Sequence, residues 1–457
     1  MTQLPGPKAP ALIQLLQWVA KPLTFMEKCA SEYGDTFQIK LNYPMVLIGH
    51  PKAIEEIFKT NPKQFDSGYG NKLLAPLVGD NSLLLLDGDR HQRHRQLLMP
   101  PFHGERMQAY GELICAIAEK VASKWVVGQP FSMRESTQKI SLKVILQAVF
   151  GLEEGQRYDQ LEQLLNSVLE SLASSWKASG LFFKFLQIDL GAWSPWGKFL
   201  RQRQEIDELL YAEIAERRQN LDPKQTDILT MLLLARDEAG EAMSDRELHD
   251  ELITLLLAGH ETTATALAWA FYWIHRQPEI SNKLLSELED LGDNPDPMAV
   301  IKLPYLNAVC CETLRIYPVA IITSPRISKS PITIMGQGYP EGTALAPCIY
   351  LTHHREDLYP EPEKFQPERF LERQYSAYEF LPFGGSTRRC IGAAFAMFEM
   401  KLVLATILKR YSLDLAEKKT VKTARRGVTI APAGGVKMVM TGKRMPQKQQ
   451  SPSVAAV

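Results

Sequence analysis

A cysteine stands among glycines and arginines in the stretch Phe383-Gly-Gly-Ser-Thr-Arg-Arg-Cys-Ile-Gly392. Cys390 precedes a predicted helix, so its sulfur would lie near unpaired backbone N–H groups and the positive end of the helix dipole. Both features are expected to lower the pKa of the thiol and favour the thiolate, which could be a nucleophile or a metal ligand. Gly384, Gly385 and Gly392 allow positive φ or a close approach of the backbone to a bulky ligand. Taken alone, such a cysteine is more often a small buried apolar side chain.

A second polar cluster, Ala258-Gly-His-Glu-Thr-Thr263, interrupts an otherwise apolar stretch. Burying a carboxylate is costly and hydroxyls disturb helix packing, which favours a chemical role for these residues. The hydroxyl of Thr262 can donate to the carbonyl of Ala258, four residues earlier, and so bend or open the helix. A groove beside Gly259 would then admit a small molecule such as dioxygen. The alternative is a polar patch satisfied by neighbouring helices.

A third pair, Glu312 and Arg315, stands three residues apart and therefore on one face of a predicted helix. On most helices such a pair is solvated and contributes about a few tenths of a kcal/mol.

The elements that would position these residues are mainly helical. Short strands are expected over 36–41 and 45–49, and again within the proline-rich stretch 325–370. Helices are expected over 51–58, through most of 105–276, after 303, and over 391–411. Ser244 and Glu247 form a capping box that opens a helix reaching Arg276, about 50 Å long at 1.5 Å per residue. We therefore predict one large, mainly α domain with a small β portion (α+β) over residues 1–440. Residues 1–22 are expected to be an extended leader and 441–457 a disordered tail.

The composition excludes several classes of protein. The 457 residues contain 52 Lys and Arg and 52 Asp and Glu, so the net charge of 52 − 52 = 0 argues against a nucleic-acid binder. The six cysteines form no C-x-x-C pair, which argues against a disulfide framework or a zinc ribbon. The uncharged stretch 9–20 is too short to span a bilayer, and His260 and Glu261 interrupt the apolar stretch 252–275. A cytoplasmic protein without a transmembrane anchor is expected.

These motifs resemble those of the cytochrome P-450 family, and they follow one another along the chain in the order that the family has. The cysteine loop is similar to F-x-x-G-x-R-x-C-x-G, the polar cluster to [AG]-G-x-[DE]-T-[TS], and the charged pair to E-x-x-R. Ser386 departs from the pattern, because the family usually has Gly there, and its side chain is expected to form a local hydrogen bond in the turn.

The resemblance implies a cytochrome P-450 fold with a long central helix, and haem b with the thiolate of Cys390 as axial ligand. It assigns proton delivery during oxygen activation to Glu261 and Thr262. A structural network around the cofactor pocket is assigned to Glu312, Arg315 and Arg369, the last from Pro367-Glu-Arg-Phe370. Haem propionates require cationic or histidine donors. The residues expected to bind the cofactor are His91, Arg95, Ala258, Arg326, Phe383, Arg388 and Gly392.

The activity implied is insertion of one oxygen atom from O2 into a C–H bond of an apolar substrate. Apolar residues in segments with loop signals are expected to contact that substrate: Leu74, Leu77, Leu257, Ile321, Ile322, Thr429 and Ile430. A long-chain fatty acid is the first expectation, because the chain resembles soluble bacterial and cyanobacterial fatty-acid hydroxylases, and a terpenoid is the second. The sequence does not indicate which residue would bind a carboxylate.

The chain contains no flavin-binding or iron–sulfur pattern, so electrons are expected from separate partners such as a ferredoxin and its NAD(P)H-driven reductase. Arg93, Arg389 and Lys401 flank the cysteine loop and are expected to attract an acidic partner. A monomer is expected. The alternatives are peroxide-driven chemistry and a haem protein that senses gas or carries electrons without oxygenating a substrate.

Overall fold

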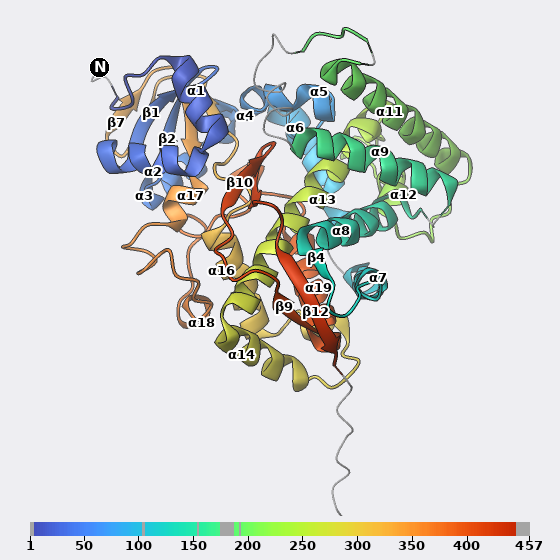
Figure 1. Cartoon of the computed structure of the whole chain (residues 1–457). Coiled ribbons are helices and arrows are strands. Elements are labelled where there is room, and N and C mark those ends of the chain that lie inside the picture. Colours follow the sequence, from blue (N-terminus) through green and yellow to red (C-terminus); the bar gives the residue numbers. More distant parts are fainter. Residues whose placement is uncertain (1–3, 103–105, 153–154, 174–186, 192, 445–457) are drawn as a thin grey trace, which may run out of the picture.

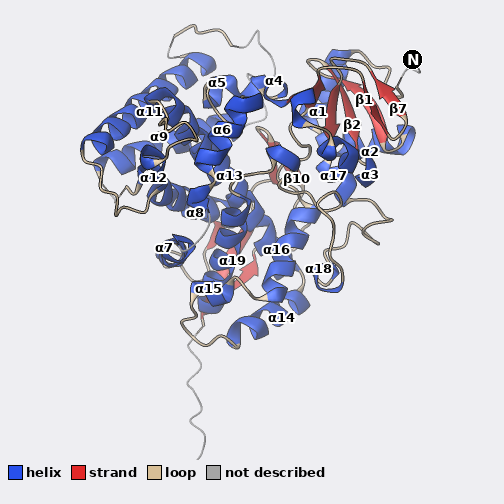
Figure 2. Ribbon diagram, turned by 180° about the vertical axis from the view of Figure 1, so that it is seen from behind, coloured by secondary structure: helices blue, strands red, loops and turns tan. Residues whose placement is uncertain are grey.

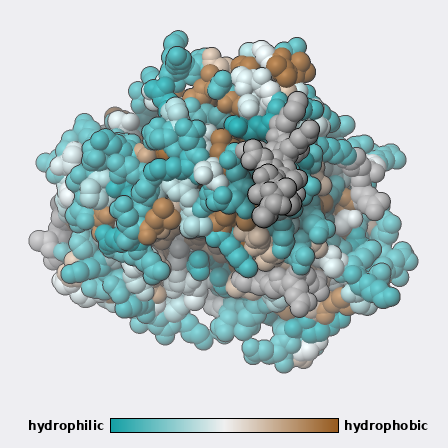
Figure 3. Space-filling view, turned by 90° about the horizontal axis from the view of Figure 1, so that it is seen from below, coloured by the Kyte–Doolittle hydropathy of each residue, from teal (hydrophilic) through white to brown (hydrophobic). Residues whose placement is uncertain are grey.

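The computed structural model describes residues 4–102, 106–152, 155–173, 187–191 and 193–444. A strand-rich part, at the upper left of Figure 1, adjoins a larger helical part that α13 crosses near its centre. Seen from behind, the strands of the smaller part are flanked by helices (Figure 2). Seen from below, hydrophilic residues cover most of the surface and apolar residues appear in small groups (Figure 3). The predicted mainly α fold with a small β portion is confirmed.

The helices account for most of the described chain. Their bounds are α1 (Ala11–Ala20), α2 (Pro22–Tyr33), α3 (Pro51–Lys59), α4 (Ser67–Gly70), α5 (Ala75–Val78), α6 (Gly88–Leu98), α7 (Arg106–Ala122), α8 (Met133–Phe150), α9 (Gln156–Ala173), α11 (Pro195–Gln219), α12 (Ile228–Leu234), α13 (Asp245–Arg276), α14 (Pro278–Glu289), α15 (Pro297–Val300), α16 (Pro304–Ile316), α17 (Ile349–His353), α18 (Arg369–Glu372) and α19 (Ala393–Arg410).

The strands form small sheets. Their bounds are β1 (Thr36–Lys40), β2 (Pro44–Ile48), β3 (Phe65–Asp66), β4 (Pro130–Ser132), β5 (Arg326–Ser328), β6 (Ile332–Ile334), β7 (Gln337–Tyr339), β8 (Ala344–Pro347), β9 (Tyr411–Leu415), β10 (Thr423–Arg426), β11 (Thr429–Pro432) and β12 (Lys437–Lys443). Within the described residues the largest sheet has the order β1-β2-β8-β5-β3. In it β2 and β8 run parallel, and the other neighbouring strands run antiparallel.

The apolar run of β2 is explained by burial on both faces of this sheet. Met45 and Leu47 pack with the cluster that includes α1 and α2, whereas Val46 and Ile48 pack with the cluster that includes α3. Because successive side chains of a strand point to opposite faces, an uninterrupted apolar sequence fits a strand covered on both sides.

Helix α13 begins where the capping box predicted. The amide of Glu247 donates to the Ser244 hydroxyl at 3.3 Å, and the Glu247 carboxylate accepts from the Ser244 amide at 2.9 Å. The helix has 32 residues, or about 48 Å at 1.5 Å per residue. Helices α8, α11, α16 and α19 pack against it, so it is the central element of the helical part.

The predictions for the two ends of the chain need correction. The expected extended leader over 1–22 contains α1, in which Leu15 and Trp18 are buried three residues apart on one helix face. The Trp18 side of this face packs in the apolar cluster that α2 forms with one face of the large sheet. This tertiary contact stabilises a helix that has no side-chain cap. At the other end, residues 441–443 belong to β12, which pairs with β9. Residues 445–457 of the predicted tail lie outside the described residues, as do 174–186 and 192 within the mostly helical stretch predicted over 105–276.

Candidate active site

The cysteine loop turns back on itself directly before α19. The backbone amide of Cys390 donates to the carbonyl of Phe383 at 2.9 Å, which closes the loop. Gly384 adopts a φ of 67° and Ser386 a φ of 59°, both in the left-handed region. Gly392 is the N-cap residue of α19, and a Cβ built on it would meet no other atom within 4 Å. The loop therefore presents Cys390 at the start of the helix on an open backbone.

Phe58, in the last turn of α3, fixes the position of this loop. A Cβ on Gly385 would lie 2.1 Å from the Phe58 ring, so only glycine allows the loop to pass so closely. The Ser386 hydroxyl donates to the Phe58 carbonyl at 2.9 Å, and the Arg326 guanidinium lies 4.5 Å from the ring centroid. The expected hydrogen bond of Ser386 thus exists, but its acceptor lies 328 residues away and not in the turn.

The predicted low pKa of the Cys390 thiol is not found. Burial raises its pKa, and this effect exceeds the opposing influence of the Gly392 amide, Arg95 and Arg389. The residue as a whole nevertheless keeps accessible surface. The helix start favours the thiolate as predicted, but desolvation disfavours it more strongly. A bound metal ion deprotonates a coordinating thiol outright, so this raised pKa is compatible with ligation.

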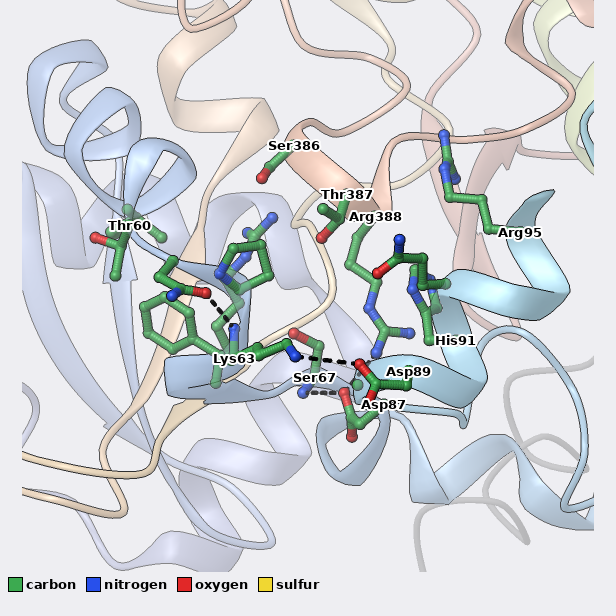
Figure 4. A pocket seen from close by; sticks show the side chains of 17 residues that line it. Thr60, Lys63, Ser67, Asp87, Asp89, His91, Arg95, Ser386, Thr387 and Arg388 are labelled. Atoms are coloured by element: carbon green, nitrogen blue, oxygen red, sulfur yellow. Dashed lines mark hydrogen bonds and ion pairs between the residues drawn. The ribbon is translucent and has the colours of Figure 1, made fainter. Parts of the chain in front are cut away.

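Four of the predicted cofactor-binding side chains meet around one cavity of about 280 Å³ (Figure 4). His91 and Arg95 come from α6, Arg326 from β5 and Arg388 from the cysteine loop. Burial, with Arg388 and Arg95 nearby, lowers the pKa of His91 to about 3, so the ring is neutral. The ionisable residues that line the cavity are thus three arginines, Lys63, a neutral histidine, Asp87 and Asp89.

The hydrogen bonds of these side chains leave donor capacity for an anion. Arg388 is paired with Asp87, whereas Arg95 donates to the carbonyl of Arg389 at 2.7 Å. Arg326 donates to the Gly385 carbonyl at 3.1 Å, and its buried Nη1 has no partner among the described residues. Burial, with Arg388 nearby, lowers the pKa of Arg326 to about 10, so it remains charged at neutral pH. A buried arginine with an unused donor fits a bound carboxylate such as a haem propionate.

The predicted charged network is present and buried. Glu312 and Arg315 have no exposed side-chain surface and are joined by hydrogen bonds of 2.7 and 2.8 Å. Arg369 lies 3.4 Å from the Glu312 carboxylate, which also accepts from the amide of Gln366. Arg315 donates in addition to the carbonyl of His353 at 2.9 Å. The network therefore joins α16 to α17, α18 and the segment before α18, and its residues do not line the cavities described here.

On α13, the Thr262 hydroxyl donates to the Ala258 carbonyl at 2.6 Å, the bond that its position predicts. Glu261 is held from α8, where Arg134 forms an ion pair with it and Gln138 donates to it at 2.8 Å. Gly259 has a different role from the one expected. A Cβ there would lie 2.7 Å from Cδ1 of Ile145 on α8, so this glycine permits close helix packing and does not border an open groove.

Two adjoining cavities contain every residue that was predicted to contact substrate. The inner cavity, of about 200 Å³, lies against α13 beside Ala258, Glu261 and Thr262; its predicted members are Leu74, Leu77, Leu257 and Thr429. The outer cavity, of about 920 Å³, lies between α1, the 41–45 turn and the β10–β11 hairpin; its predicted members are Leu74, Ile321, Ile322 and Ile430. Both cavities are lined by Leu74 and Val428, so the two spaces adjoin.

The predicted basic docking surface is largely wrong. Arg93 is ion-paired with Asp237 and Glu247 and has 26% of its side chain exposed. Lys401 donates to the Ile301 carbonyl at 2.8 Å and is half-buried. Of the three residues, Arg389 alone is exposed. Nearness in sequence to Cys390 did not predict exposure, because the helices direct these side chains toward neighbouring segments.

Several residues of the site gave no signal in the sequence analysis. Phe58 supports the cysteine loop, Asp87 pairs with Arg388, and Arg134 and Gln138 hold Glu261. Each contact joins segments more than a hundred residues apart, so local pattern and spacing could not reveal it.

Comparison with known proteins agrees with this arrangement. The family model described as "Cytochrome P450" matches residues 4–438. The chain is 36% identical over 443 residues to cytochrome P450 135B1 of Mycobacterium tuberculosis, covering 96% of this chain and 92% of that protein. It is 32% identical over 449 residues to cytochrome P450 138 of the same species, covering 95% of this chain and 96% of that protein.

Two solved structures share the fold. The retinoic acid-bound cyanobacterial CYP120A1 superimposes with a TM-score of 0.85 at 25% identity, covering 97% of this chain and 100% of that chain. The haem domain of cytochrome P450DA superimposes with a TM-score of 0.83 at 22% identity, covering 97% of this chain and 98% of that chain.

The chain therefore belongs to the cytochrome P450 family of haem-thiolate monooxygenases. The cofactor of this family is haem b with a cysteine thiolate as axial ligand, and its members generally use redox partners and apolar substrates. None of the helices in the described part of the chain combines the length and apolar character that crossing a bilayer requires.

Proposed function

We propose that this monooxygenase hydroxylates a long-chain apolar carboxylic acid, with a fatty acid as the first candidate. The observation that carries the proposal is the pair of adjoining cavities, which bring the predicted apolar residues to Ala258 and Thr262 on α13. Apolar walls bind a substrate mainly by removing its surface from water.

A terpenoid acid is the second candidate. The structural neighbour CYP120A1 was solved with retinoic acid, which is an isoprenoid carboxylic acid. A fatty acid and a terpenoid acid share a carboxylate and an apolar body, and they differ in branching and stiffness.

In this proposal Cys390 ligates the haem iron, and the cavity lined by His91, Arg95, Arg326 and Arg388 binds the propionates. A haem held by a thiolate supplies the electron density that favours O–O cleavage. The unused donor of Arg326 supports the assignment of one propionate to this residue.

Glu261 and Thr262 are proposed to move protons. The Thr262 hydroxyl lines the inner cavity and is fixed by its bond to the Ala258 carbonyl. The Glu261 carboxylate lines the same cavity, where Arg134 and Gln138 hold it in place. A carboxylate and a hydroxyl that line one cavity supply the groups needed to pass a proton from the protein into it.

Electrons are proposed to come from a ferredoxin and its reductase. Arg389 is exposed in the cysteine loop and is the remaining candidate for contact with an acidic partner. Reversing its charge with Arg389→Glu should slow reduction at low salt more than at high salt, because surface electrostatics are screened by salt. An unchanged rate and salt dependence would exclude this contact.

The first experiment is the absorption spectrum of the reduced, carbon-monoxide-treated protein. Thiolate ligation gives a red-shifted Soret band, which Cys390→His should abolish while haem is still bound. Substrate class is tested by titrating the holoenzyme with fatty acids and terpenoid acids and following the spin shift. Product formation with a ferredoxin and reductase, compared with peroxide alone, then separates monooxygenation from peroxide-driven chemistry. Absence of a spin shift with every long-chain acid would refute the proposed substrate class.

A further inference from the structure

The outer cavity has apolar walls but an uneven distribution of charge. Its lining includes Leu15, Trp18, Met45, Ile321 and Ile430. Among the described residues that line it, the charged ones are the cations Lys72 and Arg425, and neither Asp nor Glu is included. An apolar space in which the charged groups of the described lining are all positive favours a ligand with an apolar body and one anionic group.

Arg425 lies on β10, opposite Ile430 in the β10–β11 hairpin. Its Nε donates to the Gly427 carbonyl at 2.8 Å and its Nη1 donates to the Trp18 carbonyl at 3.0 Å. These two bonds orient the guanidinium beside the cavity. Burial lowers the pKa of Arg425 to about 10, which leaves it charged at neutral pH. The result is a fixed cation in a poorly hydrated site, where a carboxylate is bound more strongly than at the open surface.

Lys72 lies at the solvent side of the same cavity. The residue is exposed, and its ammonium group lies 4.4 Å from the centroid of the Tyr69 ring, which is itself 55% exposed. Lys72 therefore adds positive charge near the entrance, whereas Arg425 is the more deeply placed of the two cations.

The cavity continues toward the residues proposed to act in catalysis. Leu74 and Val428 line both the outer cavity and the inner one, and Thr262 lines the inner one. The outer cavity measures about 920 Å³ and the inner one about 200 Å³. Sites for drug-sized ligands usually measure about 300–1,000 Å³, so this space is large enough for such a ligand. An elongated molecule can thus place one end at Arg425 and the other near Thr262.

We propose that Arg425, assisted by Lys72, binds the carboxylate of the substrate and directs its apolar chain past Leu74 and Val428 toward Thr262. This inference rests on the proposed function, because it supplies the residue that recognises an apolar carboxylic acid. It further states that the carbon that is hydroxylated lies far from the carboxyl group.

The test compares ligands that share an apolar chain and differ in the head group. Dodecanoate, dodecanol and methyl dodecanoate are titrated into the wild-type holoenzyme, and affinity is read from the spin shift. Dodecanoate should bind about 10- to 100-fold more tightly than the two neutral ligands, as expected for a charge-assisted hydrogen bond in a buried site. This comparison requires no variant and so does not depend on the folding of one.

The variants then assign the effect to a residue. Arg425→Met should remove most of the preference for dodecanoate and leave dodecanol binding nearly unchanged, whereas Arg425→Lys should retain part of it. Lys72→Met should weaken dodecanoate binding by roughly two- to fivefold, because its charge is exposed. Arg276→Met is the matched control, since Arg276 also donates to a backbone carbonyl, that of Lys418, and lies outside both cavities. The variant Arg276→Met should change neither the affinity for dodecanoate nor the affinity for dodecanol.

Arg425→Glu should reverse the preference, so that dodecylamine binds more tightly than dodecanoate. The hydroxylated products of dodecanoate should carry the new group in the distal half of the chain for the wild type and be more scattered for Arg425→Met.

Two results would overturn the inference while leaving the proposed substrate class intact. One is equal binding of dodecanoate and dodecanol to the wild type. The other is an equal loss of affinity for both ligands in Arg425→Met. Failure of all long-chain ligands to shift the spin state would instead refute the proposed function. If Arg425→Met does not bind haem, the wild-type ligand series and Lys72→Met decide the question.

Discussion

Ser386 offers a sharp test of how the cysteine loop is held, because two opposing contributions at this residue can be separated. Its φ of 59° lies in the left-handed region, which costs a residue other than glycine about 1–2 kcal/mol. Its hydroxyl donates at 2.9 Å to the carbonyl of Phe58, in the last turn of α3, where helix carbonyls lack intrahelical partners. Such a bond contributes about 0.5–1.5 kcal/mol.

Ser386→Ala loses the hydrogen bond and keeps the unfavourable φ, so its free energy of unfolding should fall by about 1 kcal/mol. Ser386→Gly loses the same hydrogen bond, but it removes the unfavourable energy of the left-handed φ. Glycine also has more freedom in the unfolded chain, which destabilises the folded protein by about 0.4–1 kcal/mol. These contributions nearly cancel, so Ser386→Gly should be within about 0.5 kcal/mol of the wild type. The variant that restores the usual family residue should thus be neutral, and the smaller chemical change should be the more harmful one.

The measurement is urea unfolding of the holoenzyme, followed by haem absorbance and circular dichroism. Met335→Gly is the control for the backbone contribution, because Met335 has a φ of 48° in the turn between β6 and β7 and its side chain is half exposed. It should stabilise the protein by about 0.5–1 kcal/mol. The reasoning would be refuted if Ser386→Gly were destabilised as much as Ser386→Ala, or if Met335→Gly were destabilised at all.

Further predictions concern buried charge and helix packing. Glu312→Leu leaves Arg315 buried without its carboxylate and should cost about 3–5 kcal/mol in urea unfolding; a loss below about 1 kcal/mol would contradict the network described here. Gly259→Ala should cost about 1–3 kcal/mol, because its Cβ would meet Cδ1 of Ile145, and adding Ile145→Val, which removes that atom, should restore part of the loss in a double-mutant cycle. Burial raises the pKa of Glu399 to about 7, although a hydrogen bond from Ser141 acts in the opposite direction. The native state therefore retains a proton that the unfolded chain loses above about pH 4.5. The stability that this group contributes is present at low pH and is lost as the pH rises to 7. The free energy of unfolding of Glu399→Gln should therefore rise by roughly 3 kcal/mol relative to that of the wild type as the pH goes from 4 to 8. A difference between the two proteins that does not depend on pH would exclude the effect.

The sequence predicted those parts of the fold whose signals are local. The capping box of Ser244 and Glu247 marks the start of α13 because both hydrogen bonds form within four residues. The strand expected over 45–49, which is β2, and the bond from Thr262 to Ala258 likewise rest on local signals. The prediction of an extended leader over residues 1–22 was wrong because α1 is stabilised by packing against a sheet that is distant in sequence.

Some features of the site could likewise be predicted from the sequence, whereas others depended on the tertiary structure. Sequence motifs pointed to Cys390, the charged pair of α16 and the polar cluster of α13 as candidates, because the proposed chemistry requires characteristic residues at a fixed spacing. Tertiary structure alone decided that burial outweighs the helix start at the thiol, that Arg93 is paired, and that Arg425 faces an apolar cavity. Solvent exposure and electrostatic environment depend on what the rest of the chain places around a residue, and neighbours in sequence do not determine it.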